Sequence, residues 1–134
     1  IIIYKRYKLI LNNYKLEMIF MMSLNFQAPK HEKLLMARKK NCTVRLGDVR
    51  KQYPESSIVW ITTGKKYDVK KRLYTAFIDK VRVKKFSELT SADLGHQNPE
   101  IDTIEGLRLD FEEIYKRRIT LDDIVTVIYF SEVL

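Results

Sequence analysis

The chain has 134 residues, of which 46% are hydrophobic, and its 25 Lys and Arg outnumber 17 Asp and Glu to give a formal net charge of +8. This length fits one domain with one core, and the apolar fraction excludes a chain that is disordered throughout. The one cysteine, Cys42, excludes an internal disulfide and a cysteine cluster for zinc, and His31 and His96 lie too far apart in the sequence to indicate a metal pair. We therefore expect a cytoplasmic domain without a metal or another cofactor.

Residues 1–21 differ from the rest of the chain. Lys and Arg interrupt them every few positions, so no apolar run approaches the roughly 20 residues of a membrane span, and we expect no membrane association. The charge, apolar core and cleavage site of a signal peptide are also missing in their usual order. We predict an N-terminal extension outside the natural domain, which then covers 22–134; the alternative is an amphipathic addition. The extension holds four Lys and Arg and one Glu, so the domain keeps a net charge of +5, which suits RNA binding but also solubility alone.

The remaining sequence alternates between helix-favouring and strand-favouring segments. Good helix formers follow Pro29, β-branched and aromatic residues mark strands, and a continuous apolar run near the C-terminus indicates a buried strand. In chain order we predict a helix over 31–38, strands over 42–46, 58–63 and 73–83, helical turns over 87–94, a helix over 104–115 and a strand over 124–130. This order favours an α+β fold, a small mixed β-barrel with helices packed on it.

Between the two later helices the sequence predicts a polar loop over 95–100. Asp102, with Glu105 three residues later, indicates a capping box at the start of the helix that follows.

The turn over 64–72 is crowded with basic residues, among them Lys65, Lys66, Lys71 and Arg72. Such a cluster can follow the phosphates of RNA. The alternative is a solvated hairpin tip. We retain the four side chains as candidate nucleic-acid-binding residues.

Lys40, Thr43 and Arg45 form the segment with the clearest chemistry. On an extended chain Thr43 and Arg45 point to the same face, about two rises of 3.3 Å apart, and Lys40 can curl over them. An amine beside a hydroxyl is the start of a nucleophile–base pair. A neighbouring Arg lowers the pKa of a Lys, and it can also bind a phosphate or the edge of a base. The alternative is a solvated basic strand edge.

The run LLMARKKNCTVRLGD over 34–48 resembles the signature of the ASCH domain, a relative of the PUA RNA-binding fold. That signature is a helix followed by G-x-K-x-x-[E/T]-x-R, which leads into the first strand. Lys40, Thr43 and Arg45 match its K, T and R positions, whereas Arg38 stands where the family usually has Gly. The resemblance continues in the order of the elements over residues 23–133.

The resemblance implies a PUA-like β-barrel with a cleft beside the motif, suited to RNA or a modified nucleoside. One branch of the family, the small acetylcytidine amidohydrolases, is catalytic, and its Lys, Thr and Glu correspond here to Lys40, Thr43 and Glu100. In that alternative Thr43 attacks the acetyl carbonyl, Lys40 takes its proton and Glu100 passes a proton to the leaving amine. Water then hydrolyses the acyl-enzyme. The leading expectation is an ASCH-type domain that binds RNA or a modified nucleoside.

Three further residues have competing interpretations. Trp60 lies among Ile and Val in a predicted strand, which favours a core position over stacking on a base. Cys42 alternates away from Thr43 and is expected to be packed rather than reactive. His96, in the predicted polar loop, is either a cleft residue or a loop residue without a role in binding.

Overall fold

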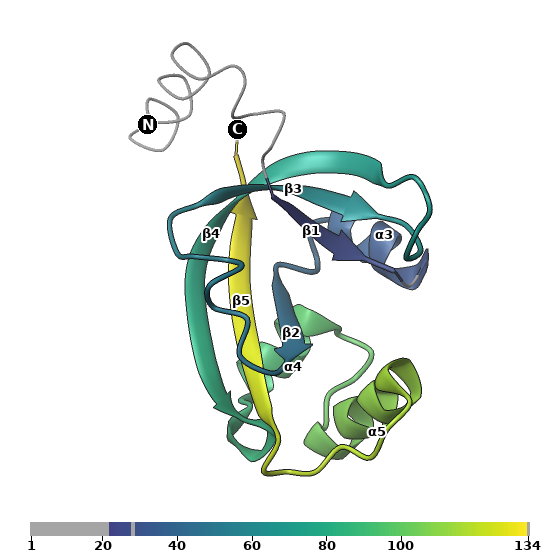
Figure 1. The fold of residues 1–134 in the computed structure, drawn as a ribbon, viewed down its shortest axis with the longest axis vertical. Coiled ribbons are helices and arrows are strands. Elements are labelled where there is room, and N and C mark those ends of the chain that lie inside the picture. Colours follow the sequence, from purple (N-terminus) through teal and green to yellow (C-terminus); the bar gives the residue numbers. More distant parts are fainter. Residues whose placement is uncertain (1–21, 28, 134) are drawn as a thin grey trace.

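The computed structural model describes residues 22–27 and 29–133, so the predicted extension over 1–21 lies outside the described residues. A five-stranded sheet in the order β1-β3-β4-β5-β2 forms the centre of the molecule (Figure 1). Its strands are β1 (Ser23–Phe26), β2 (Cys42–Leu46), β3 (Ile58–Thr63), β4 (Lys71–Lys85) and β5 (Ile124–Glu132). Only the β1–β3 pair is parallel, and the other pairs are antiparallel. The sheet curls into a half-barrel because β1 and β3 cross one end of the long strands β4 and β5 (Figure 1).

Three α-helices and one 3-10 turn accompany the sheet in the described part of the chain. They are α3 (Pro29–Met36), η1 (Phe86–Glu88), α4 (Ser91–Gln97) and α5 (Ile104–Tyr115). Helix α3 lies beside β1 and β3, whereas α4 and α5 lie at the other end, near β2 (Figure 1). This arrangement confirms the predicted α+β fold, and the curled sheet agrees with a PUA-like barrel.

Three details of the helices differ from the sequence prediction. Helix α3 begins at Pro29 and ends at Met36, two residues before the predicted bound at each end. Helix α4 continues to Gln97, so half of the predicted 95–100 loop is helical. Helix α5 is capped by Thr103, whose side chain accepts from the Gly106 N–H at 3.0 Å, and not by Asp102. The Thr103 hydroxyl, one residue nearer to the helix, accepts a hydrogen bond from a first-turn N–H group, the role that Asp102 was expected to have.

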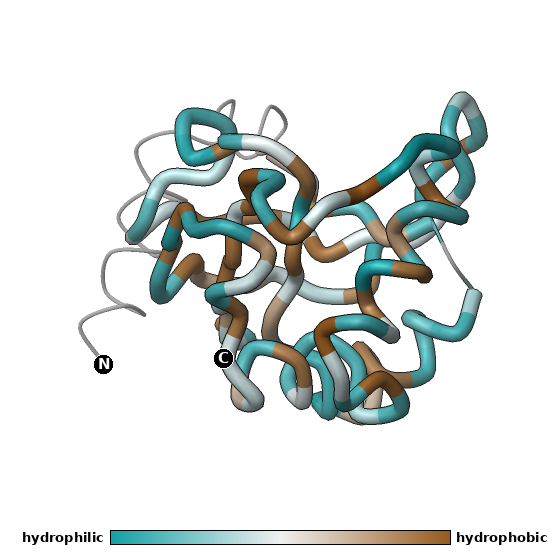
Figure 2. The backbone as a smooth tube through the Cα atoms, turned by 90° about the horizontal axis from the view of Figure 1, so that it is seen from below, coloured by the Kyte–Doolittle hydropathy of each residue, from teal (hydrophilic) through white to brown (hydrophobic). Residues whose placement is uncertain are grey.

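The core has two parts that share strand β5. One cluster lies between β1, β3, β4 and α3 and includes Leu24, Leu35 and Ile61. The other lies under η1, α4 and α5 and includes Leu107 and Phe111. Hydrophobic stretches occupy the strands and helices at the centre, and hydrophilic residues gather in the peripheral loops (Figure 2). The two clusters fix both ends of the curled sheet and thereby fix the gap between its two edges.

Candidate functional site

A cleft lies between the two edge strands of the sheet. Within the described residues, β1 pairs only with β3 and β2 only with β5, so each has one edge free of strand pairing. Side chains from both edges, from the β3–β4 hairpin and from the three helices enclose about 630 Å³, a size typical of small-ligand sites. The lining residues are Asn25, Phe26, Gln27, His31, Thr43, Val44, Arg45, Lys65, Lys66, Gln97, Asp110, Phe111, Ile114 and Tyr115.

Arg45 bridges the two strand edges. Its Nη2 donates to the backbone carbonyl of Asn25 in β1 at 2.8 Å, and its Nε donates to Thr43 Oγ1 at 3.1 Å. The guanidinium carbon lies 5.1 Å from the centre of the Phe26 ring, within the range of a cation–π contact. Thr43 and Arg45 therefore share one face of β2, as the two-residue period of a strand predicts, and both line the cleft.

Lys40 lies behind the floor of the cleft, and its side chain is completely buried. Its Nζ donates to the backbone oxygens of Cys42 and Gln97 at 2.7 and 2.8 Å and to Gln97 Oε1 at 2.7 Å. These three acceptors match the three hydrogens of an ammonium group. Burial lowers the pKa of Lys40 well below its ordinary value, and the nearby charge of Arg45 lowers it further. Lys40 thus ties the start of β2 to the end of α4.

The four candidate basic residues of the β3–β4 hairpin divide into two pairs. Lys65 and Lys66 line the cleft together with Thr43 and Arg45. Lys71 instead forms an ion pair with Glu32 at 2.6 Å. Arg72 lies over Trp60, 4.8 Å from the ring centre, and the Trp60 ring is only partly buried. The first pair therefore lies in the same cavity as the motif residues, whereas the second pair contacts Glu32 and Trp60 outside it.

Glu100 lies outside the cleft in this conformation. It is exposed, and its backbone N–H donates to Asn98 Oδ1 at 2.9 Å. Thr43 lines the cleft and Lys40 is buried behind its floor, whereas Glu100 does not line the cleft. The carboxylate that does line it belongs to Asp110 on α5, 3.9 Å from Lys30 Nζ.

Eight polar or aromatic residues of the cleft were not predicted as site residues, among them His31, Gln97, Asp110 and Tyr115. His31 stacks on Phe26 with ring centres 5.9 Å apart. Burial, followed by the charge of Lys40, lowers the pKa of His31 to about 4, so its ring is neutral at pH 7. Gln97 ends a helix that was expected to stop at residue 94. The apolar residues of α5 recur at helical spacing, which is typical of a core face rather than of a cleft wall.

Arg38, which occupies the usual glycine position of the motif, has a left-handed backbone with a φ of 59°. Glycine adopts this conformation without steric cost, which gives a physical reason for glycine there. Nε and Nη2 of Arg38 donate to both carboxylate oxygens of Glu132 at 2.8 Å, and its guanidinium lies 4.0 Å from the centre of the Tyr74 ring. These contacts hold the turn in the conformation that the motif requires.

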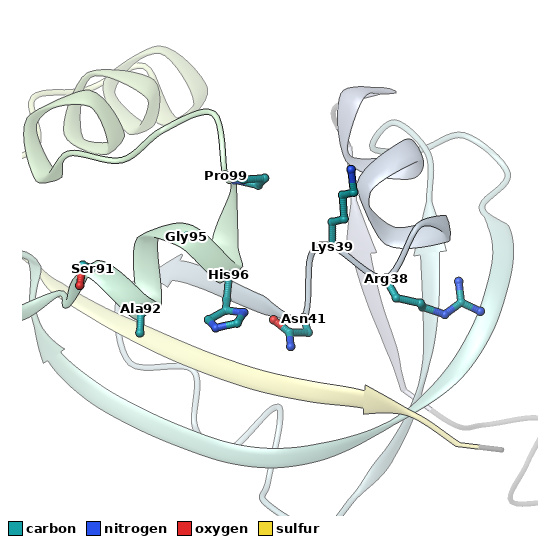
Figure 3. A pocket seen from close by; sticks show the side chains of 8 residues that line it. All are labelled: Arg38, Lys39, Asn41, Ser91, Ala92, Gly95, His96 and Pro99. Carbon is teal, nitrogen blue, oxygen red and sulfur yellow. The ribbon is translucent and has the colours of Figure 1, made fainter.

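A second, more open groove of about 640 Å³ lies between this turn and α4 (Figure 3). Lys39 rises opposite Pro99, and His96 lies next to Asn41, whereas the Arg38 side chain points away toward β5 (Figure 3). His96 therefore lines this groove and not the cleft.

Cys42 is completely buried, as expected.

Comparisons with known proteins agree with this geometry at the level of the fold. No family model matches the sequence, and no curated protein matches it. Among solved structures, a protein from Enterococcus faecalis V583 of the family DUF984 superposes with a TM-score of 0.64 at 15% identity, over 95% of this chain and 89% of that one. The ASCH domain from Lactobacillus crispatus JV V101 superposes with a TM-score of 0.57 at 11% identity, over 84% and 79% of the two chains.

The chain has the fold of an ASCH domain. The hypothetical protein PH0355 shares it, with a TM-score of 0.59 at 20% identity over 84% of this chain and all of that one. The resemblance deduced from the motif is thus confirmed for the fold. In this ASCH-type fold, none of the described helices is long and apolar enough to cross a membrane. Over the same residues, no group of three or more His, Cys, Asp or Glu is placed to hold a metal ion.

Proposed function

We propose that this ASCH-type domain binds RNA or a modified nucleoside in the cleft between β1 and β2. The observation that carries the proposal is the continuity of the motif with the basic hairpin. Thr43 and Arg45 at the floor and Lys65 and Lys66 at the rim line one cavity. A polar floor suits the edge of a base, and rim lysines suit the phosphates on either side of it.

The other walls supply surfaces on which a base can stack. Tyr115 is 39% exposed at the mouth of the cleft, and Ile114 beside it is 57% exposed. Exposed aromatic rings next to a basic groove are the usual platform for single-stranded nucleic acid, because every base has a π-face. Asp110 adds an acceptor for the amino groups of a base or for ribose hydroxyls.

Acetylcytidine hydrolysis is the second candidate, and one contact favours it. Thr43 Oγ1 accepts from the Arg45 guanidinium at 3.1 Å, so a cation stands beside the oxygen that would attack. Two other features favour binding instead. All three hydrogens of Lys40 are donated to carbonyl oxygens, and Glu100 is exposed outside the cleft.

Binding of a labelled single-stranded RNA, followed by fluorescence anisotropy, tests the main proposal. We expect wild type to bind and Arg45→Met to bind at least tenfold more weakly, because it loses the charged donor at the floor. Lys51→Met, which removes an exposed charge outside the cleft, is the matched control and should bind like wild type. Equal affinities for all three proteins would exclude the cleft as the binding site.

Incubation with acetylcytidine separates the two candidates. A domain that only binds should release no acetate above background. Deacetylation that disappears in Thr43→Ala would replace the binding proposal with the hydrolase.

A further inference from the structure

The side-chain amide of Gln97 has one allowed orientation at the cleft floor. Gln97 is 5% exposed, and its Oε1 accepts from Lys40 Nζ at 2.7 Å and from the Val44 N–H at 3.1 Å. The Val44 N–H can only donate, and Lys40 Nζ, which faces two further oxygen acceptors, donates to Oε1 as well. A flipped amide would set its own NH2 against two donors. The Val44 N–H and one of the hydrogens of Lys40 would then be buried without an acceptor, which is strongly unfavourable.

The fixed orientation turns Nε2 of Gln97 away from Lys40 and Val44. Gln97 lines the cleft. Among the described residues no hydrogen bond uses its Nε2, and this nitrogen is not one of the three buried polar side-chain atoms that have no partner, which are His31 Nδ1, Asn41 Oδ1 and Trp60 Nε1. The nitrogen is therefore not sealed in the core, and its hydrogens are free for a molecule that enters the cleft.

The neighbouring polar groups of the floor are donors as well. Thr43 Oγ1 already accepts from Arg45 Nε, which leaves the hydroxyl hydrogen to be donated. The Arg45 guanidinium has five N–H hydrogens and no acceptor, and two of its nitrogens are engaged with Thr43 and Asn25. The floor of the cleft thus offers hydrogens from Gln97, Thr43 and Arg45, while the carboxylate of Asp110 belongs to the α5 wall.

We propose that the floor selects a nucleobase through its carbonyl oxygens, with Gln97 as the specificity-determining residue and Lys40 as the residue that positions it. The inference rests on the proposed binding of RNA or a nucleoside. A carbonyl oxygen carries lone pairs and no hydrogen, so it meets the donors of the floor without conflict. An amino group at the same place would face Gln97 Nε2 donor to donor, which leaves buried hydrogens unpaired. The favoured ligand is a uracil-type base with two carbonyl groups.

The test measures the affinities of three ribonucleosides by calorimetry: uridine, the pyrimidin-2-one riboside and the pyrimidin-4-one riboside. Each of the last two lacks one of the two carbonyl oxygens. Wild type should lose about tenfold in affinity for at least one of them, the cost of leaving a buried donor without its acceptor. Gln97→Glu keeps acceptors for Lys40 and Val44 but replaces the NH2 with an oxygen, and it should reduce this tenfold preference to less than twofold.

Two more variants keep the result interpretable. Gln97→Met removes the donor without adding a charge and should lose the same preference, so it replaces Gln97→Glu if that protein does not fold. Gln52→Glu makes the same substitution at an exposed residue outside the cleft and should keep the wild-type preference.

The outcomes separate this inference from the proposed function. If nucleosides bind but the loss of either carbonyl changes affinity less than twofold, or if Gln97→Met keeps the wild-type preference, the carbonyl selection is refuted and binding stands. Displacement of uridine by millimolar inorganic phosphate would show that the floor is an anion site, which also refutes it. If neither RNA nor any nucleoside binds, the proposed function itself fails.

Discussion

Lys65 and Lys66 give the proposed interface a salt dependence whose size follows from the structure. Both line the cleft next to the motif. For single-stranded nucleic acid each phosphate contact adds about −0.7 to the slope of log affinity against log salt, so two contacts add about −1.4. Raising the salt from about 50 to 200 mM should then weaken binding about sevenfold through these two lysines alone.

The double variant Lys65→Gln/Lys66→Gln should make the negative slope shallower by about 1.4, in anisotropy titrations of one RNA oligonucleotide at four salt concentrations. Lys33→Gln/Lys51→Gln removes the same charge from exposed positions that do not line the cleft, so it should retain the wild-type slope. Equal slopes for wild type and the cleft variant would refute the assignment of the hairpin as the phosphate-binding rim.

Three other changes test parts of the account. Arg38→Gly should have a free energy of unfolding about 1 kcal/mol higher than Arg38→Ala in denaturant titrations. Both variants lose the Glu132 ion pair, but only Ala keeps the cost of the left-handed backbone. Equal free energies of unfolding would contradict this. The pKa of His31 is lowered from the ordinary 6.5 to about 4 in the folded protein. As the pH falls through 6.5, the unfolded chain therefore takes up a proton that the folded protein does not, and the free energy of unfolding decreases until about pH 4. Relative to His31→Gln, wild type should lose about 2 kcal/mol across that window after allowance for partial exposure, and parallel pH profiles would refute the assignment. Thr43→Val should weaken RNA binding about threefold to tenfold without loss of fold, because one floor donor is removed and the shape is kept; unchanged binding would place the ligand elsewhere.

The sequence predicted most of the strands and the arrangement within the motif because both depend on local patterns. The two-residue period of a strand places Thr43 and Arg45 on one face, and the structure keeps them there. Residues 58–63 are β-branched and aromatic, and the observed strand has the same bounds.

What the sequence missed depends on contacts between distant residues. Strand β1 has four residues and forms by parallel pairing with β3, whose partners lie more than thirty positions away, as in Ser23 with Trp60. Gln97 acquires its role from Lys40 and Val44, which are 57 and 53 positions away. The cleft itself exists because the sheet curls and leaves two edges facing each other, and no local pattern reports that closure. Whether Glu100 joins Lys40 and Thr43 during a reaction stays a prediction.

Nuclear magnetic resonance of the ¹⁵N-labelled protein tests the central claim most directly, because the side-chain NH2 of Gln97 gives its own signal. In a titration with single-stranded RNA, we predict that this signal and the backbone amides of Val44 and Phe111 shift together and saturate at one affinity. Shifts confined to the groove around Ser91 and His96, or no shift at any RNA concentration, would contradict binding in the cleft between β1 and β2.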